Sequence, residues 1–213
     1  VVAIDDGSRD DTWQHIQAVA AAFPGRVTAI KQPQNGGKRA ALLRGFAEVS
    51  SEVVVTVDSD SRLEPDALRG IVAPFARPEV GAVAGKVMVL NRWDNFLTRC
   101  MSARFFVTFD LMRAAQSRFG AVLCTPGALS AYRMTALRPV LDAWSRQTFL
   151  GTACTIAEDR ALTTWLLRTG WRSVYQSTAV VRTLMPTAFD RMVRMMLRWE
   201  RGNVRENLVL LPI

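Results

Sequence analysis

The stretch Val53-Val54-Val55-Thr56-Val57-Asp58-Ser59-Asp60 is the most informative feature of this chain. Its β-branched apolar residues are typical of a buried parallel strand, and two carboxylates follow at its carboxyl end. Open α/β sheets bind ligands at that end of their strands, so Asp58 and Asp60 are candidates for a metal and diphosphate site. An Asp-x-Asp is also ordinary turn chemistry, because aspartate favours turns and helix caps. The neighbouring segments must decide between these interpretations.

The composition admits several classes of partner. At 213 residues with 49% hydrophobic side chains, the chain can bury one full core. Its formal charge of +8 favours a polyanion, an anionic membrane surface or a phosphorylated substrate, without choosing among them. The three cysteines have no Cys-x-x-Cys spacing, so neither a zinc site nor a disulfide framework is supported, and a reducing, cytosol-facing environment fits best.

The two ends of the chain lie in apolar stretches. The sequence begins at Val1 inside a predicted strand and stops in the apolar run Leu208-Val209-Leu210-Leu211-Pro212-Ile213. It has no signal peptide and no uninterrupted apolar run of about 18 residues. We therefore expect a piece of a longer protein, whose membrane spans would lie outside it.

The first half of the chain predicts alternating strands and helices. Strands are expected at Val1–Ile4, Arg26–Lys31, Glu52–Val57 and Val80–Val89, and helices at Thr12–Ala22, Lys38–Val49 and Pro65–Phe75. This alternation indicates an α/β fold with a mostly parallel sheet flanked by helices.

The second half predicts two long amphipathic helices. Apolar residues recur at helical spacing over Trp93–Phe119, and Thr187–Arg201 adds a basic face with Arg191, Arg194, Arg198 and Arg201. Helices that pair an apolar face with arginine are typical of a bilayer interface, so we expect these two to be interfacial.

Two glycine-containing turns carry candidate nucleotide contacts. In Asp5-Asp6-Gly7-Ser8 the carboxylates either cap the next helix or accept hydrogen bonds from a nucleobase or ribose. In Asn35-Gly36-Gly37-Lys38-Arg39 the lysine either starts a solvated helix or lies near a phosphate. The sequence lacks the Walker spacing and Gly-x-Gly-x-x-Gly, which excludes a P-loop.

Two later motifs have the same ambiguity. Glu158-Asp159-Arg160 opens a predicted helix, where acidic residues suit the helix dipole but a carboxylate can also be a general base. Arg198-Trp199 lies on the basic helix, where it is either part of a solvated or membrane-surface face or part of a catalytic set.

Six motifs in order resolve the ambiguity through a resemblance. They are Asp5-Asp6-Gly7-Ser8, Gly37-Lys38, Asp58-Ser59-Asp60, Pro126-Gly127-Ala128-Leu129, Glu158-Asp159-Arg160 and Arg198-Trp199. Over nearly the whole chain they resemble the processive membrane glycosyltransferases of family two, most of all hyaluronan synthases and nodulation-type chitooligosaccharide (chitin) synthases. The stretches 113–122 and 198–206 strengthen this narrower match. Met195 departs from the glutamine usual in Gln-x-x-Arg-Trp, and the family's opening strand would lie upstream of Val1.

The resemblance implies a GT-A-like fold that uses a UDP-sugar. Residues 1–213 would form one glycosyltransferase catalytic domain, with a nucleotide-binding half at 1–90 and an acceptor-binding half at 91–213. Asp6 would bind uracil, Lys38 would lie beside the base or phosphates, and Asp58 would approach the ribose and metal. Asp60 would ligate Mg²⁺ or Mn²⁺, which suit oxygen ligands and bridge diphosphate oxygens.

The resemblance also implies the reaction. Asp159 would be the general base, and a single displacement would invert the donor to a β-linkage. Arg198 would meet the pyrophosphate, and Trp199 would stack under the acceptor sugar. The expected activity is transfer of a sugar, N-acetylglucosamine by resemblance, to a growing β-linked polysaccharide or oligosaccharide. The catalytic domain would be membrane-associated and would face the cytoplasm.

Two other classes of function stay open from the sequence alone. A nonprocessive family-two transferase would add one sugar to a lipid or small acceptor, but it should lack the Arg-Trp helix. A basic nucleic-acid binder is disfavoured, because the chain shows no stacked aromatic platform or recognised reader motif. We therefore expect a glycan acceptor and no nucleic acid as partner.

Overall fold

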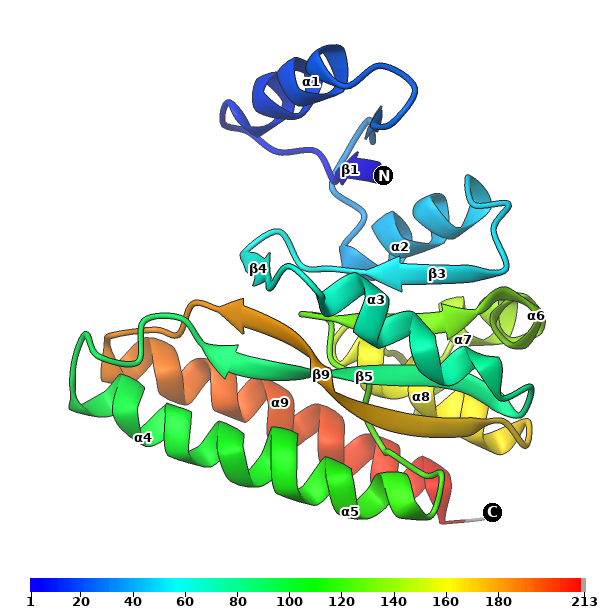
Figure 1. Cartoon of the computed structure of the whole chain (residues 1–213), viewed down its shortest axis with the longest axis vertical. Coiled ribbons are helices and arrows are strands. Elements are labelled where there is room, and N and C mark those ends of the chain that lie inside the picture. Colours follow the sequence, from blue (N-terminus) through cyan, green and yellow to red (C-terminus); the bar gives the residue numbers. More distant parts are fainter. Residues whose placement is uncertain (212–213) are drawn as a thin grey trace.

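A five-stranded sheet organises the computed structural model, which describes residues 1–211 (Figure 1). Its order is β3-β6-β5-β9-β4, with bounds β3 Val53–Thr56, β4 Ser61–Leu63, β5 Val80–Val89, β6 Ser130–Arg133 and β9 Arg172–Thr183. The long strands β5 and β9 pair in parallel, whereas the pairs β3·β6, β5·β6 and β4·β9 are antiparallel. The α/β class is confirmed, but the expected mostly parallel sheet is wrong, because this sheet is mixed.

Strand β3 explains the error. It lies at one end of the five-stranded order, pairs antiparallel with β6, and its four residues are only half-buried. The expectation of a buried parallel strand is therefore wrong. β-branched residues favour an extended backbone whichever way the partner strand runs, so the pattern identified the strand but not its pairing.

The first βαβ unit has the predicted elements. Strand β1 (Val2–Asp5) pairs in parallel with β2 (Thr28–Lys31) as a separate two-stranded sheet, with α1 (Thr12–Ala22) between them. Helix α2 (Lys38–Ala47) then leads to β3. In Figure 1 the β1-α1-β2 unit lies at the end of the molecule opposite the long helices.

Two buried clusters cover the sheet. One includes Ile71 of α3 (Ala67–Val72), Val83 of β5 and Phe105. The other includes Tyr132 of β6 and Trp144.

The remaining short elements are a 3₁₀ turn at Ala73–Ala76, α6 (Met134–Leu137), a 3₁₀ turn at Arg138–Val140, α7 (Leu141–Ser145), the hairpin β7 (Thr148–Phe149) and β8 (Thr152–Ala153), and α8 (Glu158–Arg168).

The long helices of the second half lie together beneath the sheet (Figure 1). The first is a continuous rod of α4 (Phe96–Phe105), a π-helical segment (Phe106–Leu111) and α5 (Met112–Arg118), and the second is α9 (Phe189–Leu210). Both predicted helices are confirmed, and the second is longer than its motif suggested. In the described part of the chain, residues 1–211, no helix combines the length and the apolarity needed to cross a bilayer.

Candidate active site

A cavity of about 870 Å³ opens between the sheet and the long helices. Its walls come from the turn after β3, the turn before β6, the segment leading into α8, the inner face of the α4-to-α5 rod, and α9. The cavity brings together most residues that the sequence singled out. The predicted site residues that line it are Lys38, Asp58, Asp60, Asp159, Arg198 and Trp199.

Lys38 joins two carboxylates at one end of this cavity. Its Nζ lies 2.5 Å from Asp58 Oδ1 and 3.1 Å from Glu158 Oε1, so the start of α2, the end of β3 and the start of α8 meet at one ammonium. Burial acts against the charged ammonium, but the negative charges of Asp58 and Glu158 outweigh it and raise the pKa of Lys38. Lys38 is therefore a permanent positive charge here.

Gly127 lets the neighbouring turn approach this charge cluster closely. A Cβ at this position would collide with Lys38 Nζ and lie 2.8 Å from Asp58 Oδ2. A side chain at residue 127 would therefore displace the Lys38–Asp58 pair, so glycine is favoured here by space rather than by backbone torsion, since its φ is not positive.

Asp159 lies next to the same cluster in a form suited to proton transfer. Its Oδ2 accepts a hydrogen bond from the Gly127 amide at 3.1 Å, and its Oδ1 accepts one from the Arg160 amide at 2.7 Å. Burial and the nearby Glu158 carboxylate raise the pKa of Asp159, and the charge of Lys38 opposes this rise. A carboxylate with a raised pKa is a stronger base than an ordinary aspartate.

Asp60 offers a largely uncommitted carboxylate. It is exposed, and its one hydrogen bond within residues 1–211 comes from Ser61 Oγ at 3.4 Å. No group of three or more His, Cys, Asp or Glu side chains that could hold a metal occurs in the described residues. Asp58 and Asp60 nevertheless have the right chemistry for Mg²⁺ or Mn²⁺, which commonly bind one or two carboxylates and complete their shell with substrate phosphates and water.

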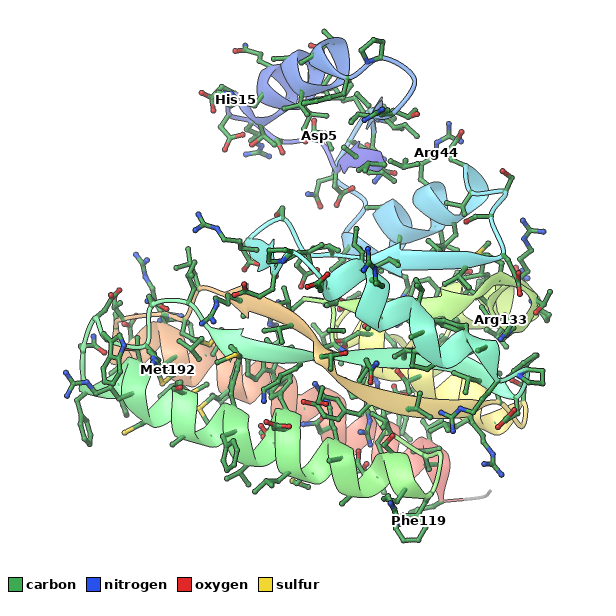
Figure 2. The ribbon with its side chains drawn as sticks, viewed as in Figure 1. Asp5, His15, Arg44, Phe119, Arg133 and Met192 are labelled. Atoms are coloured by element: carbon green, nitrogen blue, oxygen red, sulfur yellow. The ribbon has the colours of Figure 1, made fainter. Side chains whose placement is uncertain are left out.

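Asp6 is the one predicted site residue that does not line this cavity. Its Oδ1 accepts hydrogen bonds from Gln32 Nε2 at 2.5 Å and from the Gly36 amide at 2.9 Å, which ties β1 to the turn before α2. The neighbouring Asp5 is buried and accepts from the Ser8 amide; Figure 2 shows it in the separate βαβ unit. The uracil contact of Asp6 stays a prediction.

Arg198 and Trp199 reach the cavity from α9. Arg198 is exposed, and it forms no ion pair within residues 1–211. The Trp199 ring is half-buried, with its centroid 6.2 Å from that of Phe105 on the facing helix. Met195 packs against the core cluster, where an apolar side chain is well accommodated.

Helix α9 also holds the segment that presents Asp159. Arg205 Nη2 donates to the Ile156 carbonyl at 2.8 Å. Gly202 lies so close to Ala157 that a Cβ at residue 202 would collide with the Ala157 Cβ. Ala157 itself has a left-handed backbone, with φ 54° and ψ 47°, immediately before Glu158. A non-glycine residue in this conformation is strained, and the packing of α9 helps to hold it there.

Comparison with known proteins defines the family. The chain matches Glycosyltransferase like family 2 over residues 1–202, and it belongs to this family. It is 35% identical to an N-acetylglucosaminyltransferase of Azorhizobium caulinodans over 100% of this chain and 54% of that protein. It is 36% identical to one of Rhizobium meliloti over 100% of this chain and 50% of that protein. The chain spans about half the length of these curated relatives.

Solved structures agree on the fold. A mannosyltransferase from Pyrobaculum calidifontis, in complex with GDP-Man and Mn²⁺, superposes with a TM-score of 0.76 at 23% identity, over 100% of this chain and 55% of that one. GalNAc-T7 with UDP, GalNAc and Mn²⁺ superposes with a TM-score of 0.60 at 11% identity, over 95% of this chain and 43% of that one. The expected GT-A-like fold is confirmed.

Three features of the site were not predicted from the sequence motifs. The Lys38–Glu158 pair and the Gly202–Ala157 contact depend on distant segments meeting, which no local pattern reveals. Arg113 belonged to a recognised stretch but was given no role. No local pattern distinguishes it, because polar side chains such as Arg104, Thr108 and Gln116 also face inward from this rod.

The Gly202–Ala157 contact yields a stability prediction. Gly202→Ala should lower the free energy of unfolding by about 1–3 kcal/mol through overpacking. Ala157→Gly should be neutral or stabilising, because glycine adopts the left-handed conformation without strain. Combining the two should recover most of the loss, since the second change removes the colliding Cβ. Chemical denaturation of the four proteins tests this coupling, and strictly additive effects would contradict it.

Proposed function

We propose that this chain is the catalytic domain of an inverting transferase that moves N-acetylglucosamine from UDP-N-acetylglucosamine to a growing β-linked oligosaccharide or polysaccharide. One observation carries the proposal: the Asp159 carboxylate, two candidate metal ligands, several cations and an aromatic side chain line one cavity. The relatives described as N-acetylglucosaminyltransferases support the choice of sugar. The motif resemblance to hyaluronan and chitooligosaccharide synthases supports a polymeric acceptor.

The donor occupies the end of the cavity near β3 in this proposal. Lys38 and Arg198 supply positive charge for the diphosphate, Asp58 faces the ribose, and Asp6 binds uracil. Asp58 and Asp60 would hold the Mg²⁺ or Mn²⁺, which when bound neutralises negative charge on the departing diphosphate. The Mn²⁺ in the two superposed structures supports this use of a divalent cation. Residues 1–90 then form the nucleotide half and residues 91–213 the acceptor half.

Asp159 acts as the base. Its carboxylate takes the proton of the acceptor hydroxyl while that oxygen forms a bond to the anomeric carbon and the bond from that carbon to the UDP oxygen breaks. A single displacement of this kind converts an α-linked donor to a β-linked product. The Gly127 and Arg160 amides orient the carboxylate toward the cavity, and Lys38 keeps a positive charge beside it.

The long helices have one surface suited to contact a glycan and another suited to contact a membrane. Their facing surfaces bring polar side chains to the cavity, among them Arg104, Thr108, Gln116, Asn203 and Asn207. Large apolar side chains are exposed elsewhere on the same helices, namely Phe96, Phe106, Val107, Leu111, Phe119, Phe189, Val193, Leu197, Val204 and Leu208. Phe119, for instance, projects from the end of the rod into solvent (Figure 2). This division supports a glycan path between the helices and a membrane against their outer faces.

The metal hypothesis predicts the effect of Asp60→Asn. The substitution keeps the shape of the side chain but removes charge where the diphosphate must be neutralised. Sugar transfer should fall by roughly two or more orders of magnitude. Chelation with EDTA should reproduce the loss in the wild-type protein, and added Mn²⁺ should reverse it. Full transfer by the wild type in excess EDTA would end the metal hypothesis.

The base hypothesis predicts a different profile for Asp159→Asn. Transfer should fall by about 10²–10⁴-fold, while UDP affinity measured by calorimetry changes little. In the wild type, transfer should decline as pH falls through the pKa of Asp159. Because that pKa is raised, the decline should begin at a higher pH than for an ordinary aspartate. A matching loss of UDP binding in the variant would reassign the residue to donor recognition.

The membrane proposal predicts that charges on the outer helix face weaken lipid binding. Phe106→Glu combined with Leu111→Glu should abolish flotation of the chain with phosphatidylcholine–phosphatidylglycerol vesicles, because two carboxylates would enter the apolar interface. Phe23→Glu is the matched control: Phe23 is 53% exposed, similar to Phe106 at 57%, but it lies at the end of α1. Equal flotation of all the proteins would count against an interfacial role.

A further inference from the structure

Arg113 is a buried cation without a carboxylate partner. It lies in α5 with 6% of its surface exposed, and its guanidinium carbon is 3.9 Å from the centroid of the Phe109 ring. Its Nη1 is buried and has no hydrogen-bond partner among residues 1–211. A buried N–H donor without an acceptor costs free energy, and a buried guanidinium remains protonated, so this arrangement needs an explanation.

Other buried arginines differ from Arg113. Arg39, which is half-buried, leaves Nε and Nη2 unpaired, and Arg160 leaves Nε unpaired. Each donates through another nitrogen, to the Trp144 carbonyl and to Asn207 Oδ1 respectively. Arg133 donates to Glu52 and to three backbone carbonyls. No hydrogen bond from the Arg113 guanidinium to an oxygen atom is found within the described part of the chain. Arg39 and Arg133 are fixed by backbone carbonyls. Arg160 also lines the cavity but is fixed by Asn207, so Arg113 differs in facing the cavity without a hydrogen bond to an oxygen atom of the described residues.

The position of Arg113 in the cavity indicates which substrate lies next to it. Arg113 and Cys124 both line the wall, and the negative charge of Asp159 acts on the guanidinium, whereas burial raises the pKa of the Cys124 thiol and keeps it neutral. Lys38 pairs with Asp58 and Glu158, and the charge of Asp159 acts on Lys38 as well. In the proposed function Lys38 receives the donor diphosphate and Asp159 contacts the acceptor hydroxyl. This leaves Arg113, the other cation on which Asp159 acts, for the acceptor.

We infer that Arg113 donates a hydrogen bond from Nη1 to the acetamido carbonyl oxygen of the terminal acceptor sugar, and so selects N-acetylated acceptors. The inference rests on the proposed function. A neutral amide oxygen satisfies the donor without bringing another negative charge beside Asp159 and Glu158. The Phe109 ring beneath the guanidinium holds its plane in place, which gives the hydrogen bond a fixed direction.

The test compares two acceptors that differ in the acetamido group. The full-length protein in membranes is given labelled UDP-N-acetylglucosamine with either chitotetraose or cellotetraose, and kcat/KM is measured for each acceptor. The wild type should prefer chitotetraose by at least about tenfold, because a site built to hydrogen-bond a group rejects analogues that lack it. Arg113→Met, which keeps much of the volume, should reduce that ratio to about one, chiefly through the KM of chitotetraose. Its UDP affinity should be unchanged.

A second variant and a second acceptor series keep the test decisive if Arg113→Met does not fold. Arg113→Lys retains the charge but not the planar guanidinium donors, so it should keep a preference for chitotetraose that is smaller than that of the wild type. A second acceptor series on the wild type replaces the terminal acetamide with a free amine, which should lower kcat/KM as much as cellotetraose does. Arg118→Met is the matched control, since Arg118 is an exposed arginine on the same helix that does not line the cavity.

Each outcome supports or overturns a specific role for Arg113. A wild type that transfers N-acetylglucosamine while Arg113→Met keeps the full chitotetraose preference would overturn the inference and leave the proposed function standing. Equal losses for both acceptors would make Arg113 a structural residue. A stronger preference for an acceptor that ends in a uronic acid would assign the guanidinium to a carboxylate instead. A wild type that transfers to neither acceptor would overturn the proposed function together with this inference.

Discussion

The ammonium of Lys38 is the interaction on which the site depends. It joins the carboxylates of Asp58 and Glu158, and so draws together the end of β3 and the start of α8 from positions 100 residues apart in the chain. Gly127 closes over this cluster because it has no side chain to displace it, and its amide then orients Asp159. The cation therefore compensates a concentration of acidic groups that would otherwise repel one another, at the point where an anionic donor must also be received.

Helix α9 supplies the second constraint. The same helix carries Arg198 and Trp199 into the cavity and, one turn later, presses Gly202 against Ala157. The strained backbone at Ala157 sets the direction of the first turn of α8, which carries Asp159. Helix α9 therefore positions the base as well as the proposed donor and acceptor contacts. This arrangement explains why a residue as small as Gly202 matters: any side chain there would separate α9 from the segment that presents Asp159.

The sequence predicted local features well and pairings poorly. Helix Thr12–Ala22 and strand Val80–Val89 have the bounds expected from periodicity, and the Asp-x-Asp motif follows its strand as expected. The twelve-residue strand β9 was not predicted, although it lies beside β5 at the centre of the sheet. Its Tyr-Gln-Ser-Thr interior weakens the apolar pattern that marks strands. The pairing of Lys38 with Glu158 was equally hidden, because it depends on which strand ends meet in space.

The inner faces of the long helices show how polar groups are divided between fold and ligand. Asp110, in the π-helical segment, faces the sheet and is satisfied by Lys86 Nζ at 2.5 Å and Tyr175 Oη at 2.8 Å. Phe109, the preceding residue, faces the cavity and supports Arg113. A π-helix turns less per residue than an α-helix, so neighbouring side chains can share the inner side of the rod. Asp110, which anchors the rod to the sheet, is thus paired within the protein. Arg113, which faces the cavity, keeps an unpaired Nη1 donor that a ligand can use.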